Sequence, residues 1–599
     1  MNNEVKTING YDIKDVKAIR TYDTVALLKA DRKLKQGQHV KTRGYYSIND
    51  GGGAEYYITS TQSQLDFQEN LENGLYANLH ILNGVIKAEQ VGIKGNTNDN
   101  SNCNELLTTL LNYASENNYT IEFMKKIYTC FNVHIPANTR INGNGATFKK
   151  PNFKIEPYNL LPNVYGWYGI FLLDKQTSND EPLPIIIKDC IFDGNCWEIW
   201  SIEEGFSQQQ GSLITAFGNE SYTSRINAYF YNVTVQNNSS DGFHIRSQAN
   251  VYIENAKSFE CFRGGLTCTG GGSKVKVNGF EFNGNLLPDG IDLENDSQSH
   301  ERNEYYFENI TINNDLDLAE PGDNTLLCVN NMVSKGEIII RGTTLGVYIS
   351  NSYFKISDST KNFLINNVGE NNKKMVFTNC IFDGTIDPTT QEGTSISMMH
   401  VYPGSASTNI KAITQFKSCE FKNLYTISGG SHINGQIDFI NCKFDSSITG
   451  TAIGNTGIVQ NADFSPRILN IIDCTFDNAN YIARCQGYSS DIRTVNFINN
   501  RITNTSNLGL DIYRALVNFD QTFIENGWSI HWRPDPKYRL FGKRTFITTD
   551  TTKVPTNTIK GVHGNDTIII MSSDYQTPLA KFIFDDSNST WSTVFNNIE

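Results

Sequence analysis

One tetrapeptide pattern recurs along this chain and constrains its fold more than any other feature. It consists of Asp, Asn or Ser, then Cys, any residue and Phe, in the forms DCIF, NCIF, SCEF, NCKF and DCTF. Such recurrence indicates one structural position in a repeating unit. Since Cys acts there as a small apolar side chain, we expect stacked, buried free thiols, and no Cys/His spacing resembles a zinc site. The cysteines of the pattern are Cys190, Cys380, Cys419, Cys442 and Cys474.

The spacing of the polar corners predicts the kind of repeat. Ser418 and Asn441 are 23 residues apart, and Asp473 and Asn499 are 26 apart. A period in the low twenties with short strands is typical of a parallel β-helix, whereas a β-propeller blade needs about twice that length and a leucine-rich repeat needs regularly spaced Leu. The 28 Tyr and 34 Phe residues also favour strands. The predicted fold class is therefore all-β, with a parallel β-helix as the main body.

Changes in pattern along the chain predict four regions. Residues 1–20 form a leading segment, and residues 21–90 mix helix-like and strand-like runs, which indicates a small N-terminal module. Residues 91–530 form the β-helix, and residues 531–599 form a short β-rich C-terminal domain. The β-helix would begin with a helix that covers the backbone of the first coil. Four leucines are expected on one face of that helix: Leu106, Leu107, Leu110 and Leu111.

Charge and hydropathy argue against two kinds of partner. The formal net charge of -13 is unfavourable for a nucleic-acid-binding surface. No uncharged apolar run reaches about 18 residues, so we expect no membrane span. The first twenty residues lack the basic patch and apolar core of a secretion signal, so none is expected.

Three segments fit as consecutive rungs of the helix. They are DGFHIR, GGLTCT and DGIDLE, in which Phe243, Leu266 and Ile291 lie 23 and 25 residues apart. In this register the apolar positions stack inward and the polar positions stack outward, because side chains alternate along a strand. Arg263 precedes the middle rung. The stacked polar positions are Asp241 with Asp289, then His244, Thr267 and Asp292, and then Arg246, Thr269 and Glu294.

The chemistry of these side chains predicts a catalytic groove. Crowded carboxylates push their pKa values apart, so that one can act as a general acid and another as base or nucleophile. The strand spacing suits an inverting glycosidase better than a retaining one. We expect substrate binding by His244, Arg246 and Arg263, which suit an acidic group, and at the small residues Thr267 and Thr269. The predicted catalytic carboxylates are Asp241, Asp289, Asp292 and Glu294.

Simpler interpretations of the same residues stay open. Asp289 lies between Pro and Gly and suits an ordinary turn. Asp292 and Glu294 also suit solvated strand positions or a calcium site, although the predicted chemistry needs no cofactor. His244 also suits an ordinary surface position, and Arg263 a structural ion pair.

Three stretches of the sequence resemble a known group of proteins. Residues 23–58 resemble the N-terminal module of many bacteriophage tail spike and tail appendage proteins of the pectate-lyase-like superfamily. Residues 92–114 resemble the opening motif of that superfamily, but Asn replaces several of its acids. The three rungs resemble its central coils, including those of phage members that degrade teichoic acid. The resemblance covers residues 20 to 530.

The resemblance implies a right-handed, single-stranded β-helix in a homotrimer on the virion, attached to the phage tail through its N-terminus. Such proteins degrade a host cell-surface glycopolymer, which is a capsule, an exopolysaccharide or a teichoic acid, during adsorption. The match places the catalytic acids at Asp241, Asp289, Asp292 and Glu294. A hydrolase is the first hypothesis. Two others stay open, a polysaccharide lyase with Arg263 or His244 as the base, and a receptor-binding spike without activity.

Overall fold

The structure is a computed structural model of the 599-residue chain. It describes residues 7–8, 11–12, 19–62, 67–96, 102–153, 155–157, 168–176, 183–196, 211–218, 224–284, 290–294, 301–313, 316–318, 324–343, 345–356, 363–367, 373–384, 399–403, 412–424, 427–429, 435–445, 458–460, 468–477, 481–486, 493–503, 509–513, 515–524, 540–549, 551–553, 566–573, 576–585, 588 and 590–598. The chain folds as two compact units, Met1–Phe262 and Arg263–Glu599.

The first unit contains a small sheet with one short helix. Its strands lie in the order β3 (Arg20–Tyr22), β4 (His39–Thr42), β5 (Glu55–Thr59), β7 (Tyr76–Leu79) and β6 (Gln68–Asn70). Helix α1 (Val25–Ala30) begins after Thr24, whose side chain accepts a hydrogen bond from the Leu27 amide. Val25 and Leu28 of α1 pack with Val40, Tyr56 and Ile58 of the sheet. This core explains the mixed helix and strand pattern of residues 21–90. Before it, β1 (Thr7–Ile8) pairs with β2 (Tyr11–Asp12).

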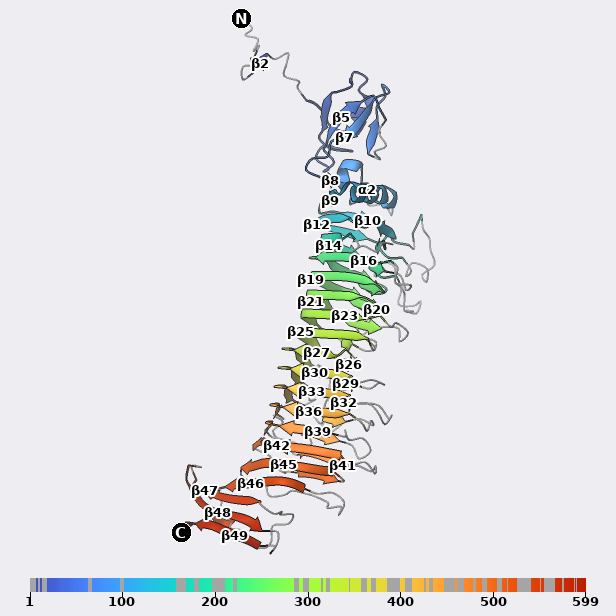
Figure 1. The fold of residues 1–599 in the computed structure, drawn as a ribbon. Coiled ribbons are helices and arrows are strands. Elements are labelled where there is room, and N and C mark those ends of the chain that lie inside the picture. Colours follow the sequence, from blue (N-terminus) through green and yellow to red (C-terminus); the bar gives the residue numbers. More distant parts are fainter. Residues whose placement is uncertain are drawn as a thin grey trace. The chain divides into compact units, whose positions relative to one another are not determined.

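Helix α2 (Asn104–Asn117) lies at the start of the coils, beside β8 and β9 in Figure 1. Leu107, Leu110 and Leu111 are fully buried, but Leu106 is exposed, so the expectation that all four leucines share the buried face is wrong for Leu106. A helix advances about 100° per residue, and the buried stripe of residues 107, 110, 111 and 114 leaves Leu106 at its edge.

The coils of the first unit are built from parallel strands. In one sheet, β12 pairs with β14, β14 pairs with both β16 and β17, and these two strands both pair with β19. A second sheet runs through β11, β13, β15 and β18. The remaining bounds are β8 (Val85–Lys87), η1 (Ala88–Val91), β9 (Thr120–Glu122), β10 (Ile127–Thr129), β11 (Val133–Ile135), β12 (Arg140–Lys149), β13 (Phe171–Leu173), β14 (Ile185–Asp193), β15 (Ile214–Phe217), β16 (Ile226–Tyr231), β17 (Thr234–Asn238), β18 (Phe243–Arg246) and β19 (Ala249–Cys261).

The second unit stacks parallel strands in the same way, from green to red in Figure 1. One sheet runs β20, β22, β24, β26, β29, β32, β35, β38, β41 and β44. The bounds in this sheet are β20 (Leu266–Thr269), β22 (Ile291–Glu294), β24 (Leu316–Leu318), β26 (Ile338–Arg341), β29 (Phe363–Asn367), β32 (Met399–Pro403), β35 (Ile427–Gly429), β38 (Ile458–Gln460), β41 (Tyr481–Gln486) and β44 (Gly509–Tyr513).

The other strands of the second unit form the companion sheet. They are β21 (Lys274–Asn283), β23 (Asn303–Ile312), β25 (Thr325–Lys335), β27 (Val347–Ser350), β28 (Tyr353–Lys355), β30 (Lys374–Thr378), β31 (Ile381–Asp383), β33 (Ile413–Lys417), β34 (Glu420–Lys422), β36 (Gln436–Ile440), β37 (Lys443–Asp445), β39 (Ile468–Ile472), β40 (Thr475–Asp477), β42 (Arg493–Ile498), β43 (Arg501–Thr503), β45 (Ala515–Ile524) and β46 (Leu540–Thr548). The predicted fold class, an all-β, right-handed, single-stranded parallel β-helix, is confirmed.

The pattern changes at the C-terminal end. β47 (Thr567–Met571) still pairs in parallel with β46, but β48 (Pro578–Asp585) and β49 (Thr590–Asn596) add on in antiparallel fashion. A 3-10 turn, η3 (Thr551–Lys553), lies between β46 and β47. The three boundaries between the four regions drawn from the sequence stay predictions.

The corners explain the recurring tetrapeptide. Ser418, Asn441, Asp473 and Asn499 all have positive φ angles between 52° and 55°, a left-handed conformation that Asn and Asp tolerate better than most residues. Their side chains also join neighbouring coils, because Asn441 donates to the Ser418 hydroxyl at 3.0 Å and Asn499 donates to the Asp473 carboxylate at 2.6 Å. The corner residue thus supplies both the turn and a link between rungs.

The prediction of buried free thiols is confirmed. All five cysteines of the tetrapeptide are free and buried. Within the second unit each donates a hydrogen bond to a backbone carbonyl, as Cys442 does to Phe416 at 3.3 Å. The Phe that follows stacks on its equivalents, with ring centres 4.9 Å apart for Phe421 and Phe444 and 4.6 Å apart for Phe444 and Phe476. Each rung therefore buries its apolar face against its neighbours.

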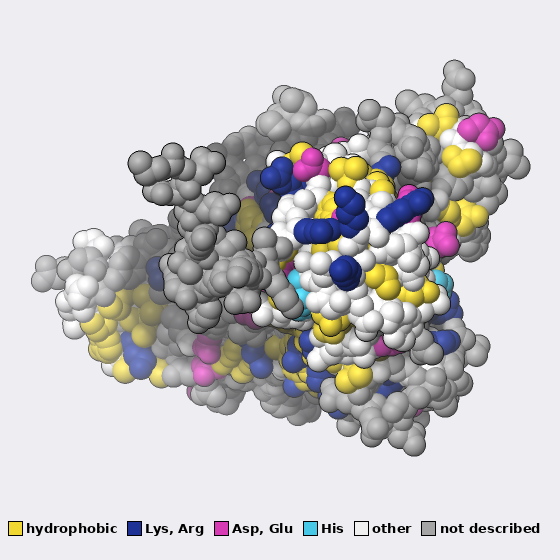
Figure 2. Space-filling model, turned by 90° about the horizontal axis from the view of Figure 1, so that it is seen from above, with side chains coloured by type: hydrophobic (Ala, Val, Ile, Leu, Met, Phe, Trp, Pro, Cys, Tyr) yellow, Lys and Arg dark blue, Asp and Glu magenta, His cyan; other side chains and the backbone are white. Residues whose placement is uncertain are grey.

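Lys and Arg side chains gather on the face seen in Figure 2. In the N-terminal module, basic side chains have carboxylate partners, such as Arg20 with Asp31 at 3.0 Å and Lys29 with Glu69 at 2.8 Å. These pairs balance much of the local charge.

Within the described ranges, no helix combines the length and apolarity that crossing a bilayer requires.

Candidate active site

Strands β20 and β22 lie in the register expected from the sequence. Leu266 pairs with Ile291, Thr267 with Asp292, and Thr269 with Glu294. Leu266, Cys268, Ile291 and Leu293 are fully buried, as expected of the inward positions. The prediction for these two rungs is therefore confirmed. In the next strand, Asp317 of β24 pairs with Asp292 in parallel register.

The two carboxylates of β22 have different surroundings. The Glu294 side chain is 56% exposed, whereas that of Asp292 is only 12% exposed. Thr267, which pairs with Asp292, is completely buried, and its hydroxyl has no hydrogen-bond partner within the described residues. The expectation that both acids emerge on an open outer face is thus met by Glu294 and not by Asp292. The alternation of side chains along a strand determines the face on which Asp292 lies, but not which neighbouring residues cover that face.

Both carboxylates converge on Arg263. Its Nη2 atom lies 3.9 Å from Asp292 Oδ2 and 3.8 Å from Glu294 Oε2, and its side chain is only 9% exposed. The two carboxylate oxygens are therefore less than about 8 Å apart, which is compatible with either geometry of a glycosidase carboxylate pair. The Asp292 carboxylate also helps to raise the pKa of the Cys268 thiol, although burial of the thiol is the larger cause.

The first unit holds the other predicted residues that the structure describes. Asp241 is fully buried, and the Ser212 hydroxyl donates to its Oδ2 atom at 3.3 Å. His244 is also buried and packs edge-to-face on Phe217 with ring centres 4.6 Å apart. Arg246 is partly exposed, and its guanidinium carbon lies 6.0 Å from the Phe217 ring centre. The structure thus brings His244 and Arg246 around one aromatic ring.

Phe217 is a residue that the sequence analysis missed. It pairs with Arg246 across β15 and β18, and it is one of the exposed large apolar side chains. An exposed ring beside a guanidinium can stack on the apolar face of a sugar. The signal that could have found it is the register of one further rung upstream, which places Phe217 in the column of Arg246.

A buried lysine is the second residue that the sequence analysis missed. Lys150 Nζ donates to the Gly211 carbonyl at 3.1 Å and to Asn238 Oδ1 at 2.9 Å. Burial lowers the pKa of this ammonium to about 7. Asn238 in turn donates to the backbone carbonyl of Asp241 at 2.8 Å, so the network fixes the chain around Asp241. No local sequence signal marks Lys150, because its partners lie 61 and 88 residues away.

Two parts of the predicted groove stay predictions. Asp289 lies outside the described residues. Phe243 belongs to the first unit and Leu266 to the second. A common groove of His244, Thr267 and Asp292 would take residues from both units, so it stays an expectation from the sequence. Among the residues that the structure describes, no three or more His, Cys, Asp or Glu side chains lie together in an arrangement that could hold a metal ion.

Fold and site together define a parallel β-helix protein with two carboxylates on one buried arginine. No protein-family model matches the chain, and no curated protein matches it in sequence. Among solved structures, it resembles a tailspike protein of the Acinetobacter baumannii bacteriophage Fri1, described as a capsular polysaccharide depolymerase, at 12% identity. That match covers 94% of this chain and 81% of the other, with a TM-score of 0.29.

Two further structures show how varied the similar proteins are. A family 28 exopolygalacturonase of Yersinia enterocolitica matches at 11% identity over 72% of this chain and 85% of its own, with a TM-score of 0.39. The surface adhesin PfbA of Streptococcus pneumoniae matches at 12% identity over 86% of this chain and 100% of its own, with a TM-score of 0.36. At these identities and TM-scores the likeness concerns the fold alone. The function has to be argued from the site.

Proposed function

We propose that the protein is a phage tail spike or tail appendage depolymerase that hydrolyses a host cell-surface glycopolymer. The observation that carries the proposal is the convergence of Asp292 and Glu294 on Arg263. Solubility does not require a buried guanidinium between two carboxylates. Burying each of these charges costs several kcal/mol before ion pairing offsets the cost. The same cluster supplies the carboxylate pair that glycoside hydrolysis needs.

The different exposure of the two acids supports separate roles. Asp292 is shielded from solvent, and in this proposal it acts as the base or nucleophile. Glu294 is open to solvent and can exchange a proton with the leaving oxygen of the polymer. Arg246 and His244, beside Phe217, provide a cationic and aromatic surface for an acidic sugar or a phosphate. Suitable polymers are teichoic acids and acidic capsular or exopolysaccharides.

The test is to incubate the purified protein with cell walls and capsule of candidate hosts. Hydrolysis predicts new reducing ends from a polysaccharide, or phosphomonoesters from a teichoic acid, together with shorter fragments by mass analysis. Absorbance near about 235 nm would instead show the unsaturated product of a lyase, in which a base removes a proton beside a uronate. Retention of the polymer without any fragments would indicate a receptor-binding spike.

A further inference from the structure

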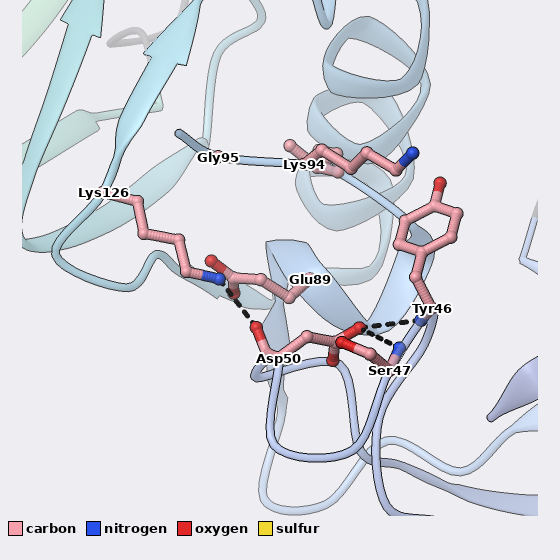
Figure 3. Close-up of a pocket in the computed structure, with 8 residues that line it drawn as sticks. Tyr46, Ser47, Asp50, Glu89, Lys94, Gly95 and Lys126 are labelled. Carbon is pink, nitrogen blue, oxygen red and sulfur yellow. Dashed lines mark hydrogen bonds between the residues drawn. The ribbon is translucent and has the colours of Figure 1, made fainter. Parts of the chain in front are cut away.

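The first unit contains a pocket far along the chain from the candidate active site. Its volume is about 190 Å³, and it lies where the N-terminal module meets η1 and the first coil (Figure 3). This volume is below the roughly 300 Å³ at which pockets for drug-sized ligands begin, and it greatly exceeds the space of one water molecule. The occupant should therefore be a single small unit. The residues that carry the argument are Tyr46, Asp50, Glu89, Ile93, Lys94 and Lys126.

The carboxylate of Asp50 is already fully used by the fold. It accepts hydrogen bonds from the backbone amides of Tyr45, Tyr46, Ser47 and Gly52 at 2.7 to 3.0 Å. Burial alone would raise the pKa of Asp50, but these four amides outweigh burial and leave the pKa below its usual value. Asp50 thus shapes the wall of the pocket and adds negative charge there.

Glu89 differs from Asp50, because half of its carboxylate is unused. Glu89 is buried, with only 3% of the residue exposed. Oε1 accepts hydrogen bonds from the Tyr128 hydroxyl and the Met124 amide, whereas Oε2 has no hydrogen-bond partner among the described residues. An unpartnered buried acceptor costs about 1–3 kcal/mol, and more if it is charged. A ligand that donates to Oε2 would recover this cost.

Two lysines supply donors to the same pocket. Lys126 Nζ reaches the Asp50 carbonyl at 2.6 Å, and Figure 3 shows its side chain extending toward Asp50 and Glu89. Lys94 Nζ lies 4.2 Å from the centre of the Tyr46 ring. Tyr46 is 49% exposed as a residue, and its hydroxyl donates a hydrogen bond to the Gly92 carbonyl at 2.8 Å. The pocket therefore combines an unpartnered acceptor, ammonium donors and an aromatic side chain on its wall.

We propose that this pocket binds one neutral sugar residue, with a hydroxyl donating to Glu89 Oε2 and neighbouring hydroxyls accepting from Lys94 and Lys126. A hydroxyl group both donates and accepts, so adjacent hydroxyls match a carboxylate beside an ammonium. The C–H face of the sugar would pack against Tyr46 and Ile93. The site is separate from the depolymerase site and does not depend on the function proposed for it.

Charge excludes the main alternatives. Asp50 and Glu89 together with Lys94 and Lys126 give a formal charge of zero. A metal ion would face two ammonium groups, and a phosphate or carboxylate would face the buried carboxylate of Glu89. A metal ion or an anion would therefore bind less favourably here than a neutral polyhydroxyl ligand.

The test uses saturation-transfer NMR on the full-length protein with glucose, galactose and N-acetylglucosamine as separate probes. We expect at least one sugar to bind with a Kd on the order of 1 mM, typical of a single small ligand. Glu89→Gln keeps the size of the side chain but turns Oε2 into a possible donor, and it should weaken binding about tenfold or more. Lys126→Met should weaken it to a similar extent.

The matched control is Lys125→Met, because Lys125 is exposed and precedes Lys126 in the sequence. It should leave the sugar signal unchanged. If Glu89→Gln disturbs folding, judged by circular dichroism, Lys94→Met and Lys126→Met carry the test. The proposal is overturned if no sugar binds to the wild type, or if binding survives every pocket variant. Phosphate or methylammonium that binds more tightly than any sugar, and is lost in the same variants, would overturn the ligand class. Asp292→Asn should not affect this binding, which separates the pocket from the depolymerase site.

Discussion

Asp292 and Glu294 occupy alternate positions of one strand, yet only Glu294 is open to solvent. Arg263 links them, and this link decides what each can do. Removing either carboxylate removes one half of an acid–base pair, while the other half and the fold remain. The chemistry of the site is therefore testable one side chain at a time.

We expect Asp292→Asn and Glu294→Gln each to lower the rate of polymer cleavage by roughly 10²–10⁴-fold, the usual contribution of a general acid or base. Glu294→Gln should leave the melting temperature nearly unchanged, because the Glu294 side chain is 56% exposed and Asp292 still lies beside Arg263 in this variant. The rate is measured from reducing ends or phosphomonoesters released. Glu308→Gln, at an exposed position of β23, is the control. Full activity in both site variants would remove this cluster from the mechanism.

Lys150 gives a prediction about pH. Its pKa is about 7 in the folded chain and about 10.4 in the unfolded chain, so between these values the unfolded chain binds more protons. The cost of burying Lys150 is therefore fully present below pH 7 and disappears as the pH rises toward the unfolded pKa. Lys150→Met removes this cost, but it also removes hydrogen bonds to Gly211 and Asn238.

The difference in melting temperature between Lys150→Met and the wild type should accordingly fall as the pH rises from about 7 to about 10. Calorimetric scans at the two pH values measure it. Lys188→Met, at an exposed position of β14, should show a difference that does not vary with pH. A constant difference for Lys150→Met would contradict the lowered pKa.

At the scale of the element, the corner is the feature that the coils share. Each corner needs a residue that tolerates positive φ, and its side chain must reach the adjacent corner. Asn satisfies both needs, and this explains why the chain is rich in Asn. The Cys and Phe that follow fill the interior behind the corner.

Asn441 separates the two contributions. Asn441→Gly keeps the backbone conformation and loses only the hydrogen bond to Ser418, which is worth about 1 kcal/mol. Asn441→Ala loses the same hydrogen bond but keeps a Cβ atom at positive φ without the Asn carboxamide, so it should cost roughly 1–2 kcal/mol more than Gly at this position. Hydrogen exchange of β36 and β37 should therefore accelerate more in the Ala variant than in the Gly variant. Equal acceleration would show that the backbone conformation contributes nothing.

At the scale of the whole molecule, the homotrimer attached to a phage tail through its N-terminal segment stays a prediction, which comes from the sequence resemblance alone. Multi-angle light scattering of the purified chain should give three chains per particle. The trimer should persist in Asp292→Asn, because that substitution is confined to the candidate site. A stable monomer at micromolar concentration would contradict this assembly. A spike role without enzymatic activity also requires the assembly, so this result bears on the virion location and not on catalysis.

The sequence by itself determined the repeat, because a period of 23 to 26 residues, polar corners and inward Cys and Phe are local requirements of every coil. It also determined that Thr267 lies over Asp292 and Thr269 over Glu294, since register follows from the same period. Only the tertiary structure decided which side chains are covered, as the burial of Asp292, Asp241 and Lys150 shows. Burial depends on residues tens of positions away, and no local pattern contains that information. For the same reason, the sequence did not reveal the unpartnered Oε2 atom of Glu89, because its surroundings come from η1, the N-terminal module and the first coil.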